Sequence, residues 1–311
     1  MVQYSIVVPA YNEEKTLQLF YDAVTLQMQS LREEYELIFV NDGSRDATKS
    51  ILNNLAALDK RVRVCHFSRN FGQQGALYCG LNEARGNAVI VMDADLQDPP
   101  SVALEMIKKW KEGYKIVHGK RRERTGERAF KKRTAALFYR VARKLTDMDI
   151  PSAVGDFKLY DRAVVDVILS MPEHDRLLRI QTAWVGFSQA FVAFDRPKRV
   201  AGDSHYTLKK MTALAKAGIL PNTQKTLSLP IKIGLFTGFL SVACVIVFIV
   251  LSCLEIWHGS LTAWLFPVVG LCTSLVLTCQ GISNMHLGMI YKEVQNRPQY
   301  IIEEKINFDN E

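Results

Sequence analysis

The sequence predicts an α/β protein built on a mostly parallel, doubly wound sheet. Short apolar runs recur through the N-terminal part of the chain, segments with helical patterning separate them, and the runs end at polar residues. A strand and a helix that repeat about every thirty residues are typical of parallel sheets with helical crossovers.

The first two expected strands are each followed by residues suited to starting a helix. Residues 4–8 form the first strand, which ends at Pro9, and the NEE sequence beyond it can cap a helix over residues 15–31. Residues 36–40 form the second strand, and the NDGS sequence around its end opens a helix over residues 46–58.

Three more strands are expected further along the chain. Residues 62–68 form the third, with a crossover helix over residues 73–84. The fourth, residues 88–92, is short and β-branched, which favours a buried parallel strand over a helical turn. The prolines at 99–100 prevent a helix from continuing through this point, and residues 115–119 form a fifth strand.

Polar side chains gather where these strands end. Tyr11, Asp42, Asn70 and Asp93 follow the first four strands in order. Ligands of open parallel sheets bind in the crevice beyond the carboxyl ends of the strands, so the functional site is expected there.

The fourth strand ends in the sequence DADLQD. Asp93 and Asp95 flank the small Ala94, and Gln97 and Asp98 follow. Two carboxylates one residue apart are oxygen ligands for a divalent cation that also takes phosphate oxygens. Taken alone, such a short motif is also compatible with an acidic surface turn.

Two common phosphate-binding motifs are absent from the sequence. It contains neither GxGxxG nor GxxxxGK[ST], which disfavours a dinucleotide site and an ATP-hydrolysing site. Tyr11 and Asp42 suit a nucleoside, since the Asp42 carboxylate can accept the imino N–H of uracil or guanine. An Asx turn that caps the following helix is an equally good interpretation of Asp42.

The charge distribution indicates anionic partners. The net charge is +7, and much of the excess lies in residues 120–144 and 196–216. Nucleic acid, nucleotide phosphates and anionic lipid all fit such segments. The six cysteines form no CxxC motif or Cys/His cluster, so a reducing compartment is expected, without a zinc site or a disulfide framework.

Two long apolar segments predict a transmembrane hairpin. Residues 233–254 and 261–283 contain no charged side chain, and about 22 helical residues extend roughly 33 Å. Lysine and arginine flank the pair on its outer sides only, which predicts that both termini are cytoplasmic and that the protein is a multi-pass plasma-membrane protein. The expected domains are residues 1–225 (catalytic), 226–290 (hairpin) and 291–311 (tail).

Two amphipathic segments predict helices in the membrane interface. Residues 129–145 and 205–218 alternate basic and apolar side chains at helical spacing, which places cations toward anionic headgroups. The same spacing is compatible with ordinary core-facing amphipathic helices.

Six motifs in order carry a family resemblance: VVPAYNE, VNDGSRDAT, RNFGQQGALYCGLNEARG, VMDADLQDPP, VGDFKLYDR and RPKRVAGDSHY. They resemble the polyprenyl-phosphate glycosyltransferases of inverting family 2, which include bactoprenol glucosyltransferases and dolichol-phosphate mannose synthase. The resemblance covers nearly the whole chain and includes NRPQYII near its end. It implies a GT-A fold, a nucleotide-sugar donor, Mg²⁺ or Mn²⁺, and a lipid-phosphate acceptor in the membrane.

The resemblance also implies roles for residues at matching motif positions. The catalytic residues would be Asp93, Asp95, Asp156 and Arg121. The metal ligands would be Asp93, Asp95 and Gln97. The nucleotide-sugar site would comprise Pro9, Tyr11, Glu13, Val40, Asp42, Asp93, Ala94, Asp95, Gln97, Arg121 and Arg199. The acceptor phosphate would contact Arg133, Arg199, Ser204 and His205.

Two acceptor-side positions leave alternatives open. Asp156 is the leading base candidate, but a phosphate oxygen is already anionic near neutral pH, so Asp156 can orient the acceptor instead. A carboxylate in a structural turn is the other interpretation of this residue. His205 stands where the family usually has lysine, so either Lys209 or Lys210 replaces that contact or the contact depends on pH.

The expected activity is transfer of a hexose, glucose or GlcNAc, from a UDP-sugar to undecaprenyl phosphate with inversion, for modification of cell-envelope glycans. A GDP-mannose-dependent mannose synthase and an inactive membrane scaffold are the alternatives, and a processive synthase is disfavoured because QxxRW is absent. The chain is expected to form a homo-oligomer, which by resemblance is a tetramer. A flippase and a second membrane glycosyltransferase are expected as protein partners. Nucleic acid is not an expected partner.

Overall fold

The structure is a computed structural model that describes residues 2–122, 154–173, 177–195 and 297–308, with scattered residues between 254 and 296. The chain divides into two compact units. The first contains Met1–Tyr139, Met148–Met211 and Arg297–Glu311, and the second contains Arg140–Asp147 and Thr212–Asn296. The fold below is that of the first unit.

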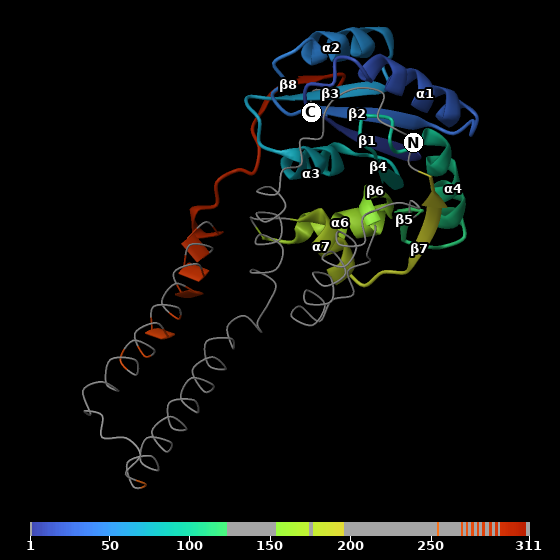
Figure 1. Cartoon of the computed structure of the whole chain (residues 1–311). Helices are drawn as coiled ribbons and strands as arrows, with labels where there is room; N and C mark the ends of the chain where they lie inside the picture. The colour runs from blue at the N-terminus through green and yellow to red at the C-terminus, as the bar shows by residue number, and fades with distance from the viewer. Residues whose placement is uncertain are drawn as a thin grey trace. The chain divides into compact units, whose positions relative to one another are not determined.

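One sheet organises this unit. Its eight described strands follow the spatial order β7-β5-β6-β4-β1-β2-β3-β8 (Figure 1). The strand bounds are β1 Tyr4–Ala10, β2 Tyr35–Asn41, β3 Val62–Phe67, β4 Ala88–Val91, β5 Ile116–Arg121, β6 Val154–Asp161, β7 Gln189–Phe194 and β8 Ile302–Ile306.

The prediction of a mostly parallel α/β sheet is confirmed. β1 pairs in parallel with β2 and β4, β2 with β3, and β5 with β7. β6 is antiparallel to both β4 and β5, so it separates the two parallel groups. The four strands that begin the chain therefore end at a common edge, as the crevice requires.

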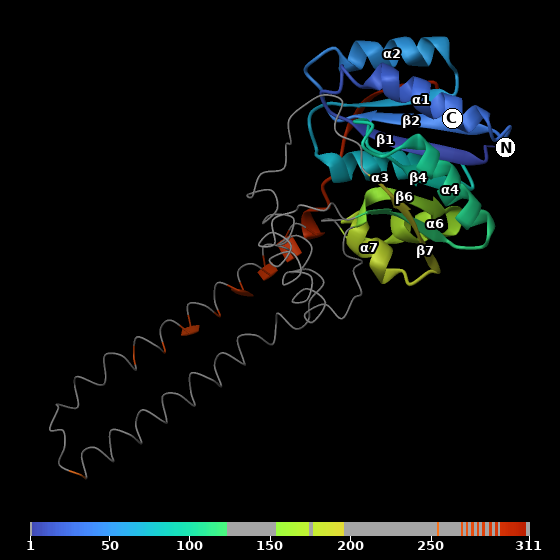
Figure 2. The same ribbon diagram turned by 45° about the vertical axis from the view of Figure 1, so that its right-hand side comes forward.

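Helices cover both faces of the sheet. Figures 1 and 2 show α1, α2 and α4 on one face and α3, α6 and α7 on the other, in agreement with the two hydrophobic clusters of the core. Their bounds are α1 Leu17–Gln29, α2 Thr48–Leu58, α3 Gln73–Glu83, α4 Pro100–Lys111, α6 Arg162–Ser170 and α7 Leu178–Trp184.

The helix α3 packs unusually close to β1. A Cβ atom added at Gly80 would lie 2.1 Å from Cγ1 of Val7, so only glycine fits where the helix crosses this strand. This contact fixes the height of α3 above the sheet, and the first turn of α3 belongs to the candidate site described below.

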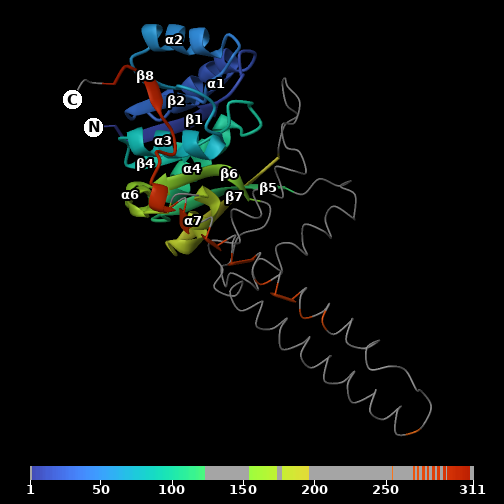
Figure 3. The same ribbon diagram turned by 90° about the vertical axis from the view of Figure 1, so that its left-hand side faces the viewer.

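The C-terminal residues complete the sheet. Ile302–Ile306 form β8 at the edge of the sheet (Figure 3), where it pairs antiparallel with β3. The sequence separates residues 291–311 from the catalytic domain as a tail, whereas the structure places Arg297–Glu311 in the same unit as β1. The separation was wrong because pairing between segments so distant in sequence leaves no local pattern.

The membrane segments predicted from the sequence stay predictions. Among the residues that the structure describes, none belongs to a helix long and apolar enough to cross a membrane. The predicted interfacial helices at residues 129–145 and 205–218 lie outside the described residues, as does most of the predicted spans at 233–254 and 261–283.

Candidate active site

The loops after β1 and β2 are tied together at the carboxyl edge of the sheet. The backbone N–H of Asp42 donates to the Ala10 carbonyl at 2.9 Å. The Asn12 N–H donates to Oγ of Ser44 at 3.0 Å, and the Arg45 N–H donates to Oδ1 of Asn12 at 2.9 Å. The loops after β1 and β2, which lie at the edge where the crevice was predicted, therefore form one hydrogen-bonded unit.

Asp42 is held by a third loop rather than by the helix that follows it. Its side chain is buried, and its carboxylate accepts the backbone N–H groups of Phe71 at 2.6 Å and Gly72 at 2.9 Å. Burial raises the pKa of Asp42, and the two N–H donors partly offset this shift. Asp46, not Asp42, accepts the Thr48 N–H at the start of α2, so the capping interpretation of Asp42 is wrong.

A glycine permits the close approach of these two loops. Gly43 has a φ of +65°, and an added Cβ would lie 2.5 Å from the carbonyl carbon of Arg69. Both the left-handed backbone and the lack of space therefore require glycine after Asp42.

The DADLQD segment folds into a tight turn after β4. Leu96 adopts a φ of +58°, which returns the Gln97 N–H to Oδ1 of Asp95 at 3.0 Å. The N–H of Asp93 points back at Oδ2 of Asp98, 3.4 Å away. A non-glycine residue in the left-handed region is a strained feature, and such strain is common at functional sites.

Asp93 is the centre of an acidic cluster. It is half-buried, and its Oδ1 accepts the side-chain amide of Gln73 at 3.1 Å. Burial raises the pKa of Asp93 above its ordinary value, and the nearby carboxylates of Asp98, Asp156 and Asp95 raise it further, while Arg121 opposes the shift.

Asp156 joins this cluster from the antiparallel strand β6. The register pairs Val91 with Lys158, and its continuation by two residues brings Asp156 opposite Asp93. Nη2 of Arg179 in α7 donates to Oδ1 of Asp156 at 3.1 Å. Because Asp156 lies within a strand, its interpretation as a turn carboxylate is wrong.

The side chain of Arg121, a predicted site residue, also lies against β6, whereas Arg179 was not predicted. A Cβ added at Gly155 would lie 3.1 Å from Nη2 of Arg121, so the guanidinium covers the backbone beside Asp156. Arg121 ends β5, and this packing places its charge beside the acidic cluster.

The cluster fits a divalent cation through its charge. Four carboxylates share the region with Arg121. Burial raises the pKa of Asp93 most, the neighbouring carboxylates raise it further, and a bound cation would relieve their repulsion. Within the described part of the chain, no three His, Cys, Asp or Glu side chains form a complete metal site. A cation that takes some ligands from phosphate and water needs only one or two protein carboxylates.

The other residues predicted for the nucleotide-sugar and acceptor-phosphate sites differ in their surroundings. Tyr11 is 38% exposed at the crevice. Pro9 lies within β1, and the Glu13 carboxylate accepts the hydroxyl of Thr16 at 2.8 Å. Val40 is fully buried in the core on the α3 side, so its side chain does not line the crevice. Ala94 is buried between the two aspartates. Arg133, Arg199, Ser204 and His205 lie outside the described residues.

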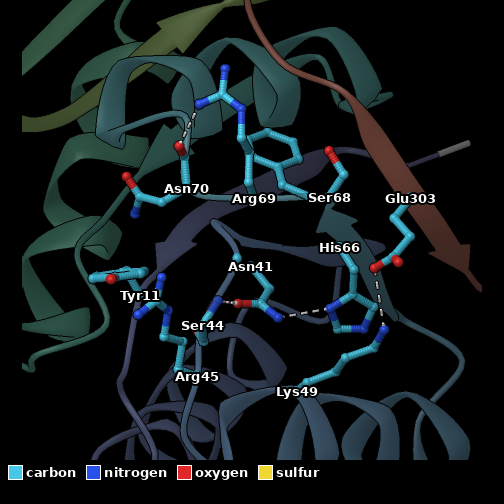
Figure 4. A pocket seen from close by; sticks show the side chains of 12 residues that line it. Tyr11, Asn41, Ser44, Arg45, Lys49, His66, Ser68, Arg69, Asn70 and Glu303 are labelled. Carbon is cyan, nitrogen blue, oxygen red and sulfur yellow. Dashed lines mark hydrogen bonds and ion pairs between the residues drawn. The ribbon is translucent and has the colours of Figure 1, made fainter.

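A cavity of about 280 Å³ opens beside Asp42 (Figure 4). Its lining is Tyr11, Asn41, Gly43, Ser44, Arg45, Lys49, His66, Phe67, Ser68, Arg69, Asn70 and Glu303. The lining residues thus come from the ends of β2 and β3, from the loops after β1, β2 and β3, from α2 and from β8. Three of them are basic, which suits an anionic or polar ligand.

A buried polar pair in this cavity, Asn41 and His66, was not among the residues predicted from the sequence. Nδ1 of His66 accepts from Nδ2 of Asn41 at 2.9 Å, and Nε2 of His66 donates to Oδ1 of Asn53 at 2.8 Å. Burial lowers the pKa of His66, and the nearby Lys49 lowers it further. Asn41 and His66 lie at or near the ends of two buried, mostly apolar strands, and this was the available signal, because buried polar groups require partners.

Comparison with known proteins identifies the class of enzyme. The sequence matches Glycosyl transferase family 2 over residues 5–169, just over half of the 311-residue chain. The chain belongs to this family, so it is a glycosyltransferase, and the α/β fold is GT-A-like.

Relatives extend this similarity over nearly the full length. A glycosyltransferase of Bacillus subtilis named YkcC, described as uncharacterized, is 43% identical over 99% of this chain and 96% of its own. A bactoprenol glucosyl transferase from the SfII prophage of Shigella flexneri is 37% identical over 96% of both chains. The family resemblance drawn from the six motifs is therefore confirmed.

A solved structure is similar to part of this chain. Glucosyl-3-phosphoglycerate synthase from Mycobacterium tuberculosis matches with a TM-score of 0.49 and 19% identity, over 70% of this chain and 76% of that chain.

Proposed function

We propose that this glycosyltransferase moves a hexose, glucose or GlcNAc, from a UDP-sugar to undecaprenyl phosphate with inversion at the anomeric carbon. The observation that carries the proposal is the arrangement of the buried Asp42 and the acidic Asp93 cluster at one edge of the sheet. Relatives along the full length that are named bactoprenol glucosyl transferases support the lipid acceptor.

The crevice suits the nucleoside half of the donor. Tyr11 offers a half-exposed ring and Asp42 a carboxylate beside a polar cavity of about 280 Å³. A carboxylate that accepts the imino N–H of a base distinguishes uracil and guanine from bases without that donor.

The acidic cluster suits the diphosphate through a metal ion. Asp93 and Asp95, with Gln97, would hold Mg²⁺ or Mn²⁺, which neutralises charge on the departing diphosphate. Arg121 lies beside the same carboxylates and adds positive charge on the protein side.

Asp156 orients the acceptor in this proposal rather than removing a proton. Its ion pair with Nη2 of Arg179 at 3.1 Å fixes the direction of the carboxylate, and a phosphate oxygen that is already anionic near neutral pH needs no base. A lipid-phosphate oxygen forms the new bond to the anomeric carbon while the bond to the UDP oxygen breaks. This single displacement inverts the configuration and needs no carboxylate nucleophile.

Attachment to the cytoplasmic side of the plasma membrane belongs to the same proposal. The apolar segments 233–254 and 261–283 and the basic amphipathic segments 129–145 and 205–218 support it. Arg133, Arg199, Ser204 and His205 would meet the acceptor phosphate there.

A donor panel tests the proposal. The full-length chain is incubated with Mg²⁺ or Mn²⁺, undecaprenyl phosphate and radiolabelled UDP-glucose, UDP-GlcNAc or GDP-mannose. Label in the organic-extractable lipid with a UDP-sugar is the expected result. Transfer from GDP-mannose alone would establish the mannose synthase instead, and no transfer from any donor would favour the scaffold. Full turnover in excess EDTA would remove the metal from the reaction.

A further inference from the structure

The C-terminal segment contacts the loop that holds Asp42. The N–H of Ser68 donates to the carbonyl of Ile301 at 3.1 Å, just before β8 begins. The Tyr300 ring stacks on the Phe67 ring with centroids 5.2 Å apart and planes inclined by 10°. The residues that precede β8 therefore make a second set of contacts, at the end of β3 and the start of the loop after it.

Those contacts lead directly to the Asp42 carboxylate. The Phe67 ring meets the Phe71 ring edge to face, with centroids 5.7 Å apart. The Phe71 N–H is the donor that lies 2.6 Å from Oδ1 of Asp42. The Phe67 ring therefore lies between Tyr300 and Phe71, the residue whose backbone N–H bonds Asp42.

The same loop continues into the residue that holds Asp93. Gln73, the first residue of α3, donates its side-chain amide to Oδ1 of Asp93 at 3.1 Å. Two residues further on, a Cβ added at Gly75 would lie 3.5 Å from the Gln299 carbonyl oxygen and 3.8 Å from Cβ of Tyr300. The C-terminal segment therefore packs along the stretch from Phe67 to Gly75, which bonds both aspartates.

The far side of the C-terminal segment is also anchored. The Gln299 amide lies 3.4 Å from the carbonyl of Glu173, and Glu303 contributes to the lining of the cavity beside Asp42. Covering the open edge of β3 would require only the backbone pairing of β8. The contacts of residues 299–301 go beyond that requirement, because besides the last residue of β3 they reach the loop after it and α3.

We propose that residues 299–302 act as a positioning element for the nucleotide-sugar site, in which Tyr300 holds the stretch from Phe67 to Gly75 against Asp42 and Asp93. The inference rests on the proposed function for the identity of the ligand, but the positioning itself is a property of the free protein. Tyr300 is a positioning residue, since it acts through Phe67 and Phe71.

The test compares two aromatic residues of the same C-terminal segment. Tyr300→Ala removes the ring that meets Phe67. Phe308→Ala, the matched control, removes a ring at the other end of β8, where it contacts the Arg63 guanidinium at 4.0 Å. Tyr300→Phe keeps the stacked ring and serves as the rescue variant.

Amide hydrogen exchange in the full-length chain without nucleotide is the first readout. The Phe71 and Gly72 amides should exchange at least tenfold faster in Tyr300→Ala than in the wild type, and remain near wild type in Phe308→Ala and Tyr300→Phe. Calorimetric titration with UDP and Mn²⁺ is the second readout. The dissociation constant should rise at least fivefold in Tyr300→Ala only.

The outcomes separate this inference from the proposed function. Unchanged exchange in Tyr300→Ala, or equal acceleration in both alanine variants, would overturn the positioning role. Wild-type protein that binds no uridine or guanosine nucleotide would overturn the proposed function, while the exchange result would still decide the role of Tyr300.

Discussion

Burial of the Asp42 carboxylate is tolerated because two backbone N–H groups face it. A buried carboxylate without such donors is strongly destabilising, and each lost bond leaves a donor without an acceptor. The same two bonds fix the loop after β3 against the loop after β2. At the scale of single residues, the side chain proposed to bind the nucleoside is therefore also the one that holds the two loops together.

Asp42→Asn is expected to destabilise the protein and weaken nucleotide binding. The amide keeps one acceptor oxygen, so either the Phe71 or the Gly72 N–H loses its partner, at a cost of about 1–3 kcal/mol. Urea unfolding measures the stability change, and titration with UDP measures the affinity. Asp22→Asn, an exposed substitution on α1, is the control. Wild-type stability of Asp42→Asn would contradict this account.

His118 is expected to make stability depend on pH. Its ring is buried, stacks on Phe191, donates from Nε2 to Gln189 at 2.8 Å, and has no hydrogen-bond partner for Nδ1 among the described residues. Burial, with a smaller effect of Lys158, lowers the pKa of His118 from 6.5 to about 4. The unfolded chain therefore takes up this proton first as the pH falls.

The sign of the effect follows from that order of protonation. The His118 contribution is complete above pH 6.5 and decreases by up to about 3 kcal/mol as the pH falls toward 4. The free energy of unfolding is measured against pH for the wild type and for His118→Gln. The difference between the two curves isolates the His118 contribution, because His66 and the carboxylates titrate in both proteins. Parallel stability curves from pH 7 to pH 4 would contradict this account, because they would show that His118 takes up its proton as readily in the folded protein as in the unfolded chain.

At the scale of elements, the crossing of α3 over β1 determines where the first turn of α3 lies. That turn carries Gln73, which bonds Asp93, and it begins beside Gly72, which bonds Asp42. The position of one helix above one strand thus sets the position of two donors to the site.

Gly80→Ala should disturb this crossing. The new methyl would overlap Cγ1 of Val7, and overpacking of this kind costs about 1–3 kcal/mol despite the higher helix propensity of alanine. Gly75→Ala on the same helix is the matched control, because its nearest neighbours lie 3.5 Å away. Urea unfolding should separate the two variants, and Val7→Ala should restore part of the loss. Equal stability of the two glycine variants would contradict the packing argument.

Several elements were missed in the sequence for identifiable reasons. The prolines at 99–100 were interpreted only as a stop, whereas Pro100 is the first residue of α4, a position where proline needs no N–H partner. The VGDFKLYDR motif, which contains Asp156, was assigned to the acceptor side by resemblance. Its position in an antiparallel strand between β4 and β5 depends on long-range pairing. Local patterns do not encode such pairing.

At the scale of the whole molecule, the C-terminus belongs to the catalytic unit. β8 follows the predicted membrane hairpin in sequence, so the chain leaves the catalytic unit and returns to it. Cutting the chain after Lys225 would therefore remove β8 and expose the edge of β3. A loss of activity in the truncated chain would then reflect either lost membrane attachment or a disturbed fold.

An internal deletion separates these effects. Replacement of residues 226–296 by a long flexible Gly/Ser linker keeps β8 on the same chain as β3. The variant is expected to retain UDP binding within about threefold, while its transfer to membrane-embedded undecaprenyl phosphate falls at least tenfold. Scintillation counting of extracted lipid and UDP titration measure the two properties. Full transfer by the deletion variant would contradict the anchoring role of the hairpin.

The sequence alone determined the positions of the first four strands along the chain and the edge where Tyr11, Asp42 and Asp93 lie, because short apolar runs and polar strand ends are local signals. The order of these strands in the sheet came from the structure. The sequence also determined the family, through six motifs in order. Only the tertiary structure decided that Phe71 and Gly72 bond Asp42, that Arg179 pairs with Asp156, and that residues 302–306 complete the sheet. These contacts join segments far apart in the chain, and their energies depend on packing and burial that no single segment specifies.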